Sequence, residues 1–244
     1  MDFIGEVAAW FADPTTWSGR NGIPSRLLEH LWISAVGLGM GAAIGLPLGL
    51  AIGHTGRGSL LVVSIANIGR AVPSLGLMGL AFLLLLPLGL GVGPFPAIVA
   101  LTALAIPPII VNTYAGLRGV DRELIEAARG MGMRAAQVIW RLEVPVALPV
   151  ILAGIRTSAV QVVATATLAG VIGGGTLGEL IIIGFNTGDQ VRVFGAALVV
   201  AALSIVTELG FAGLQHAMAS PGLRGRPIPP PEDPGQVAHA AGEV

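Results

Sequence analysis

The acidic and basic residues of this sequence gather in one internal block, among small and apolar residues. The block spans residues 118–143, about a ninth of the chain, and holds nine of the 27 acidic and basic side chains. These are Arg118, Asp121, Arg122, Glu123, Glu126, Arg129, Arg134, Arg141 and Glu143. A small apolar patch ringed by charge favours docking into the groove of a protein partner. An ordinary charged loop fits the pattern equally well.

Residues that commonly carry catalysis or bind metals are few and lie far apart. The chain has no cysteine, and its four histidines fall at the ends of apolar segments or in the tails. They are His30, His54, His216 and His239. An intramembrane enzyme would need catalytic groups that converge, and no zinc or serine–histidine pattern is present. We therefore expect no catalytic residue and no metal site.

Nucleotide binding by this chain is also not expected. All 13 basic residues are arginines, whereas a phosphate-binding P-loop requires a lysine. Gly173, Gly174 and Gly175 therefore do not form such a loop. They follow an apolar segment, and we interpret them as a flexible exit from it, with Glu179 near the surface.

The composition is that of a membrane protein. Hydrophobic residues make up 54% of the chain and charged residues 11%, with a mean hydropathy of +0.83. Soluble domains carry about 25% charged residues, so this chain lacks the side chains for a polar shell. The 36 glycines fit closely packed membrane helices. A net charge of −1 argues against nucleic acid as a partner.

Apolar segments of about 20 residues predict the membrane spans. We expect five, at Leu31–Gly53, Leu60–Leu88, Phe95–Leu117, Val144–Ile172 and Val193–Gln215. Six remain possible, because the second segment is long and is interrupted by Arg70 and Pro73. The predicted fold class is thus an all-α membrane protein.

Arginine positions predict the orientation, since positive residues stay on the cytoplasmic side. The charged block would lie inside and the amino terminus outside. Residues 1–26 then form an extracytoplasmic segment, for which an interfacial helix ending before Pro14 and a frayed terminus fit the pattern equally well. Residues 27–218 form the membrane domain, and the proline-rich residues 219–244 form a disordered cytoplasmic tail. The expected location is the plasma membrane.

The charged block itself predicts two short helices on the cytoplasmic face. Asp121 is a candidate N-cap, and one apolar stripe follows at helical spacing. That stripe comprises Leu124, Ala127, Ala128 and Met131. Gly130 and Gly132 allow a turn, after which a second stripe from Ala135 to Leu142 ends before Pro145.

The block resembles the signature of permease subunits of bacterial type I ABC importers. The matching positions are Glu126, Ala127, Ala128, Gly132, Leu142 and Pro145, with leucine where the family often has isoleucine. In that family the loop, here residues 118–145, is a coupling helix that docks into a cleft of a separate ATPase subunit. The resemblance thus implies a type I importer permease fold, with the contact to the ATPase in this loop.

Further stretches resemble permeases for osmoprotectants such as glycine betaine, choline and carnitine. They lie at 64–82, 96–132 and 148–181, and the likeness covers roughly 27–215. It implies two ATPase subunits that bind ATP–Mg, a separate extracytoplasmic binding protein, and a second permease chain, identical or similar. This chain would bind no cofactor itself. Arg70 departs from the family, where the position is usually uncharged.

Two alternatives concern the solute and the energy source. An importer of another small solute, such as an amino acid, would share the same loop. An ion-coupled carrier would need ionisable groups at mid-membrane and an internal repeat. We find few such groups and no convincing repeat.

Several residues within the spans are candidates for the translocation pathway. They are Pro73, Ser74, Ser158, Gln161 and Thr165. The prolines fit simple kinks as well, and most of the hydroxyl and amide groups fit hydrogen bonds between helices.

Three charges lie at a similar depth in the predicted spans: Arg70, Arg156 and Glu208. Facing lipid would cost each on the order of 3 kcal/mol. We predict that Glu208 pairs with Arg156 or Arg70. The alternative is that each side chain reaches the interface separately.

Overall fold

The computed structural model describes residues 2–58, 64, 66, 69 and 72–218, and all regular elements in this part are helices. Four helical stretches are long and apolar enough to cross a membrane. These are α2 (Ile23–Thr55), α5 (Pro94–Arg118), α10 (Gln190–Met218), and the stretch Ala135–Ile172, which contains α8 (Val144–Ala166). The predicted all-α membrane architecture is thereby confirmed.

Shorter helices lie before and between these four stretches, and three short helical segments lie within the stretch Ala135–Ile172. They are α1 (Phe3–Ala12), η1 (Pro14–Trp17), α4 (Ser74–Leu85), η2 (Leu86–Leu88), α6 (Arg122–Gly130), α7 (Ala135–Val138), the π-helical turn η3 (Ile139–Glu143), η4 (Thr167–Ile172) and α9 (Leu177–Thr187). Helix α9 was not predicted. Its 11 residues would extend only about 16 Å, too short for a span.

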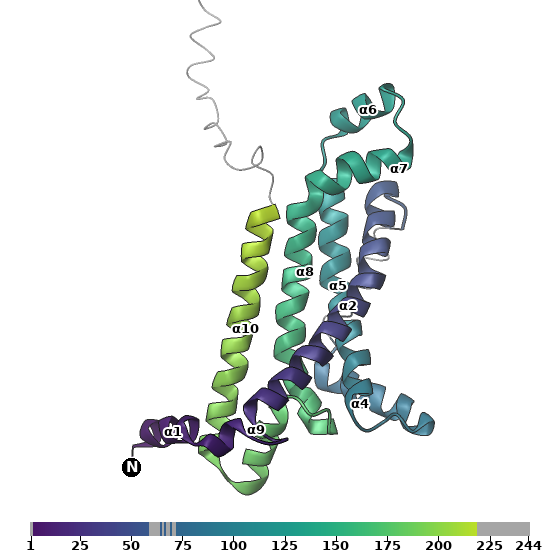
Figure 1. Cartoon of the computed structure of the whole chain (residues 1–244). Coiled ribbons are helices and arrows are strands. Elements are labelled where there is room, and N and C mark those ends of the chain that lie inside the picture. The colour runs from purple at the N-terminus through teal and green to yellow at the C-terminus, as the bar shows by residue number, and fades with distance from the viewer. Residues whose placement is uncertain (1, 59–63, 65, 67–68, 70–71, 219–244) are drawn as a thin grey trace, which may run out of the picture.

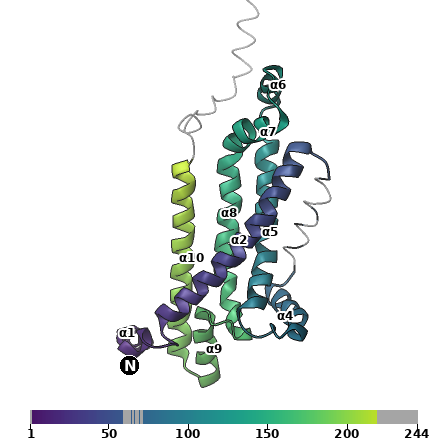
Figure 2. The same cartoon turned by 45° about the vertical axis from the view of Figure 1, so that its right-hand side comes forward.

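The long helices form a bundle with distinct ends (Figure 1). Helices α6 and α7 project from one end, the hairpin end, where α10 also finishes. Helices α1, α4 and α9 lie at the other, the amino-terminal end, and a second view shows the same division (Figure 2). Since α2 ends at the hairpin end and α4 begins at the amino-terminal end, the chain changes ends between Thr55 and Ser74. The first part of the second predicted span, Leu60–Leu88, falls in this interval, where most residues lie outside those that the structure describes.

The most extensive helix contact within the described residues is between α2 and α5, and glycine makes it possible. From Gly37 to Gly53, every fourth residue of α2 is a buried glycine, and each faces a residue at the same spacing on α5. The pairs are Gly37–Leu101, Gly41–Ala105, Gly45–Ile109, Gly49–Thr113 and Gly53–Leu117. A β-carbon added to any of these glycines would lie only 2.5–3.0 Å from its partner's side chain. The two backbones can approach this closely only because the side chains are absent.

Buried polar side chains join the central helices at two further points. Ser158 Oγ on α8 donates to the carbonyl oxygen of Ala105 on α5 at 2.8 Å. His30 Nε2 on α2 lies 2.8 Å from the carbonyl oxygen of Val163 on α8. Apolar residues such as Ile33, Leu101 and Val162 fill the core around these contacts.

Helix α10 is the least buried of the long helices. Only 11% of its most apolar stretch is buried in the chain, against 67% for α5. Its contacts are chiefly with α8, α9 and α1, and Trp10 of α1 packs on Gly195. Most of the surface of α10 is therefore available to lipid or to another subunit.

Candidate functional site

The two short helices that the charged block predicted are α6 and α7, which with their connecting turn form a hairpin over residues 122–138. Local hydrogen bonds define its start. Asp121 Oδ1 accepts from the backbone nitrogen of Glu123 at 2.9 Å, so Asp121 caps α6 as expected. Glu123 lies in the first turn, where the positive end of the helix dipole favours a carboxylate.

A glycine turn joins α6 to α7. Gly132 has φ of +84°, a conformation that side chains disfavour. The Met133 nitrogen donates to the carbonyl oxygen of Ala128 at 3.1 Å, closing the turn. On its far side the backbone nitrogen of Arg134 donates to Gln137 Oε1 at 2.8 Å. The two helices are thus held in one arrangement by short-range bonds.

The two sides of α6 differ in exposure. Ala128 is buried, whereas Glu126 and Ala127 are exposed. Leu124 and Met131 are 49% and 78% exposed, large values for apolar side chains. Of the predicted apolar stripe, only Ala128 therefore packs inward. Leu124, Ala127 and Met131 face outward, without a partner within the described residues. An exposed apolar surface of this kind is typical of a contact with another protein or with a membrane.

The remaining residues of the signature lie at the turn and at the base of the hairpin. Gly130 and Gly132 are exposed, Leu142 is half-buried in the π-helical turn, and Pro145 is exposed in the first turn of α8. The π-helical turn continues directly into α8. A displacement of the hairpin would therefore act on α8 without an intervening flexible loop.

A buried polar pair connects the hairpin base to α2. His54 Nδ1, near the end of α2, lies 2.7 Å from Oε2 of Glu143, and the glutamate side chain is 4% exposed. The sequence did not predict this pair, because the only signal at His54 was its position at the end of a span. A glutamate two residues before Pro145, in the stretch that leads into the next span, was the one available signal.

Within the bundle, Arg156 of α8 and Glu208 of α10 form an ion pair. Arg156 Nη1 also donates to Gln215 Oε1 at 3.3 Å, and Gln215 Nε2 donates to the carbonyl oxygen of Pro149 at 3.1 Å. The side chains of the pair are 36% and 39% exposed in the isolated chain. Arg70, the other predicted partner, lies outside the described residues.

The candidate pathway residues do not form one cluster with a shared environment. Ser158 is fully buried and bonded to α5, which agrees with the alternative of a hydrogen bond between helices. Gln161 and Thr165 share a face of α8, four residues apart, and are half-buried. Pro73 precedes α4 and Ser74 begins it, at the amino-terminal end (Figure 1). A lining role for Gln161, Thr165, Pro73 and Ser74 stays a prediction.

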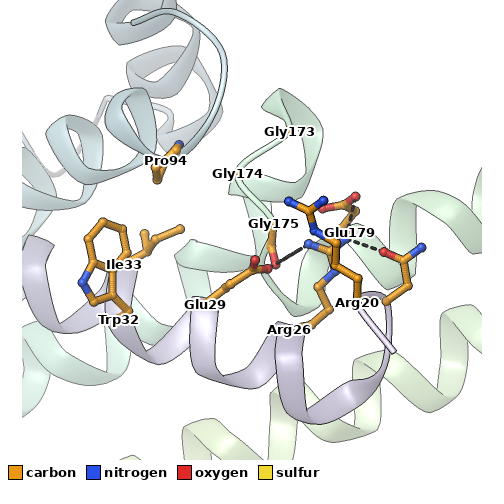
Figure 3. Close-up of a pocket in the computed structure, with 11 residues that line it drawn as sticks. Arg20, Arg26, Glu29, Trp32, Ile33, Pro94, Gly173, Gly174, Gly175 and Glu179 are labelled. Atoms are coloured by element: carbon orange, nitrogen blue, oxygen red, sulfur yellow. Dashed lines mark hydrogen bonds and ion pairs between the residues drawn. The ribbon is translucent and has the colours of Figure 1, made fainter. Parts of the chain in front are cut away.

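The fold also brings polar residues together in a pocket at the amino-terminal end of the bundle. It is lined by Arg20, Asn21, Arg26, Glu29, Trp32, Ile33, Pro94, Gly173, Gly174, Gly175 and Glu179. Figure 3 shows these residues converging from α2 and the segment before it, from the start of α5, from the glycine turn before α9 and from the first turn of α9. We call it the amino-terminal pocket.

Arg26 organises one wall of this pocket. Its Nη1 donates to Glu29 Oε2 at 2.8 Å and to the carbonyl oxygen of Gly175 at 3.1 Å. Its Nη2 donates to Asn21 Oδ1 at 2.6 Å and lies 3.0 Å from Glu179 Oε1. Arg26 is only 7% exposed. Two carboxylates compensate this buried charge, as a buried guanidinium requires.

The glycine turn is held by the same arginine. Gly175 is bonded through its carbonyl oxygen to Arg26, and the Gly174 nitrogen donates to the carbonyl oxygen of Ala169 at 2.8 Å. The sequence predicted a flexible exit from the span here, whereas these two hydrogen bonds hold the turn in place. Nothing in the sequence predicted this role of Arg26, because its partners Gly175 and Glu179 lie far away along the chain.

Comparison with known proteins finds relatives over most of the chain. The model of the family described as "Binding-protein-dependent transport system inner membrane component" matches residues 41–220. The glycine betaine/carnitine/choline transport system permease protein OpuCB of Bacillus subtilis is 41% identical over 81% of this chain and 88% of its own length. The osmoprotectant import permease protein OsmW of Salmonella typhimurium is 35% identical over 83% of this chain and 94% of its own.

Solved structures share the fold. The inward-facing MetNI methionine ABC transporter aligns with a TM-score of 0.73 at 24% identity, over 85% of this chain and 99% of the matched chain. An amino acid ABC transporter with histidines aligns with a TM-score of 0.65 at 22% identity, over 90% and 98%. At these identities the likeness concerns the fold alone.

Proposed function

Because the chain belongs to the family of binding-protein-dependent transport system inner membrane components, we propose that it is the permease of an ATP-driven importer for quaternary ammonium osmoprotectants. Glycine betaine, choline and carnitine are the solutes we expect. The similarity to OpuCB over four fifths of the chain carries this proposal. The amino-acid transporters among the solved structures share the fold and give no support for an amino-acid solute.

The hairpin is the proposed contact with a separate ATPase subunit. Its outward face offers Ala127 beside the apolar side chains of Leu124 and Met131, with Glu126 at the edge. A small residue among larger ones lets a partner's groove close around the helix. ATP–Mg would be bound by the ATPase, and this chain would bind no cofactor. Two ATPases and a second permease chain would complete the membrane assembly.

Movement of the hairpin would reach the spans by two routes. The π-helical turn leads into α8, and the pair between Glu143 and His54 leads into α2. Helix α2 would then carry α5 with it, since their backbones are in close contact from Gly37 to Gly53. ATP-driven closure of the ATPases would in this way change which side of the membrane the pathway faces.

The solute would arrive from the end opposite the hairpin. We place the hairpin in the cytoplasm of a bacterium and the amino terminus outside, as the arginine distribution favours. A separate extracytoplasmic binding protein would deliver the solute to the amino-terminal end.

Reconstitution tests the proposal directly. The permease, its ATPase and its binding protein would be assembled in proteoliposomes, and uptake of radiolabelled glycine betaine, choline, carnitine and methionine would be measured. We expect ATP-dependent uptake of at least one quaternary ammonium compound and none of methionine. Uptake of methionine alone, or uptake driven by an ion gradient without ATP, would overturn the proposal.

A further inference from the structure

The amino-terminal pocket has the size and position of a solute site. Its volume is about 520 Å³, within the range of about 300–1,000 Å³ that small-molecule sites occupy. It lies at the end of the bundle away from the hairpin, because it is built from the beginning of α2 and the turn before α9 (Figures 1 and 3). A solute delivered at that end would meet it before the core of the bundle.

The charged groups of the pocket balance. Arg20 and Arg26 are opposed by Glu29 and Glu179. Arg26 is engaged by both carboxylates, whereas Arg20 is exposed and makes no hydrogen bond or ion pair within the part of the chain that the structure describes. The pocket thus has no net charge, but it offers the unpaired guanidinium of Arg20 and the carboxylate of Glu29. Such a pocket suits a ligand that carries one positive and one negative charge.

An aromatic face lies beside the carboxylate. Trp32 follows Glu29 by three residues on α2, so the two side chains share a helix face. Both line the pocket, and Trp32 is 53% exposed. In Figure 3, Trp32 lies toward Pro94, and the two arginines lie on the other side of Glu29. An indole face attracts cations, and quaternary ammonium groups in particular.

We propose that the amino-terminal pocket is a second binding site for the transported solute, specific for quaternary ammonium compounds. The methylated cation lies against Trp32 and Glu29, and the carboxylate of a zwitterion points toward Arg20. Arg26 is a positioning residue that holds Glu29 and Glu179 in place. This site rests on the proposed function and deepens it, because the permease itself would then contribute to solute selection after release from the binding protein.

The test compares two solutes in the reconstituted complex. Glycine betaine carries a carboxylate and choline does not. Maximal uptake rates are measured with saturating binding protein for the wild type, Trp32→Leu, Arg20→Gln and the control Phe185→Leu. Phe185 is a 68% exposed aromatic residue on α9 that does not line the pocket. Melting temperature in detergent monitors the fold.

Trp32→Leu should lower the maximal rate for both solutes by on the order of threefold to thirtyfold, the range that a cation–π contact supports. Arg20→Gln should slow glycine betaine and leave choline unchanged. The site is overturned if Trp32→Leu acts no more strongly than Phe185→Leu, or if Arg20→Gln slows both solutes equally. A wild-type complex that takes up neither compound would instead overturn the proposed function, and the site with it.

Discussion

His54 and Glu143 are separated by 89 positions in the sequence, yet His54 Nδ1 lies 2.7 Å from Glu143 Oε2. The contact joins the end of α2 to the base of the hairpin, where the π-helical turn passes into α8. Glu143 is 3% exposed and has its side-chain bond to a residue of another helix. The position of α2 relative to the hairpin therefore depends on this pair.

Replacing His54 should weaken the coupling between ATP hydrolysis and solute transport. His54→Ala leaves the buried carboxylate of Glu143 without its partner, which costs about 1–3 kcal/mol. We expect fewer solute molecules imported per ATP hydrolysed and a lower melting temperature. His54→Gln, which can still donate a hydrogen bond, should retain much of the coupling. Thr55→Ala, at the exposed neighbouring position, is the control, and an unchanged transport-to-ATP ratio in His54→Ala would contradict the role.

Adding one methyl group to α2 should destabilise the bundle at Gly41 but not at Gly39. A β-carbon at Gly41 would lie 2.5 Å from that of Ala105, while one at Gly39 would meet nothing within 4 Å. Gly41→Ala should cost about 1–3 kcal/mol through overpacking. Gly39→Ala should be neutral or stabilising by up to about 1 kcal/mol, since alanine favours helix over glycine.

Thermal unfolding in detergent measures both variants. Adding Ala105→Gly to Gly41→Ala should restore part of the loss, because it removes the atom that the new methyl group meets. Equal melting temperatures for Gly39→Ala and Gly41→Ala would show that α2 and α5 are further apart than described here.

The hairpin surface gives a prediction about assembly. Ala127 is exposed, so Ala127→Asp should leave insertion and folding intact while abolishing solute uptake and weakening copurification of the ATPase. Gly132→Glu should do the same, with an added loss of stability because Gly132 has φ of +84°. Ala12→Asp, an exposed alanine at the other end of the bundle, is the control. Normal uptake in both hairpin variants would exclude this surface as the ATPase contact.

The ion pair between Arg156 and Glu208 should stabilise the packing of α10 on α8. Glu208→Gln removes one charge, and because both side chains are more than a third exposed, we expect a loss on the order of 1 kcal/mol. That corresponds to about 2–4 °C in melting temperature for a chain of this size. The exchange Arg156→Glu with Glu208→Arg should restore part of it. Identical melting of Glu208→Gln and the wild type would show that the pair has no structural role.

Several features of this protein follow from local sequence. The apolar segments around Leu31–Gly53 and Phe95–Leu117 predict helices because a span must satisfy its backbone hydrogen bonds internally. Asp121 and Gly132 mark the start and turn of the hairpin because capping and positive φ depend only on nearby residues. Counting residues along the helices also placed Arg156 and Glu208 at a similar depth.

The tertiary structure decides which helix faces meet and at what axial position. Among the described residues, Glu208 pairs with Arg156 because α8 and α10 pack together. The depth of each residue in its span could not show which helices are neighbours. The bonds of Arg26 to Gly175 and Glu179 and of His54 to Glu143 join residues far apart in sequence. Helical periodicity describes each helix by itself, whereas these contacts depend on the rotation and sliding of one helix against another. Only the packing of side chains in three dimensions determines that relation.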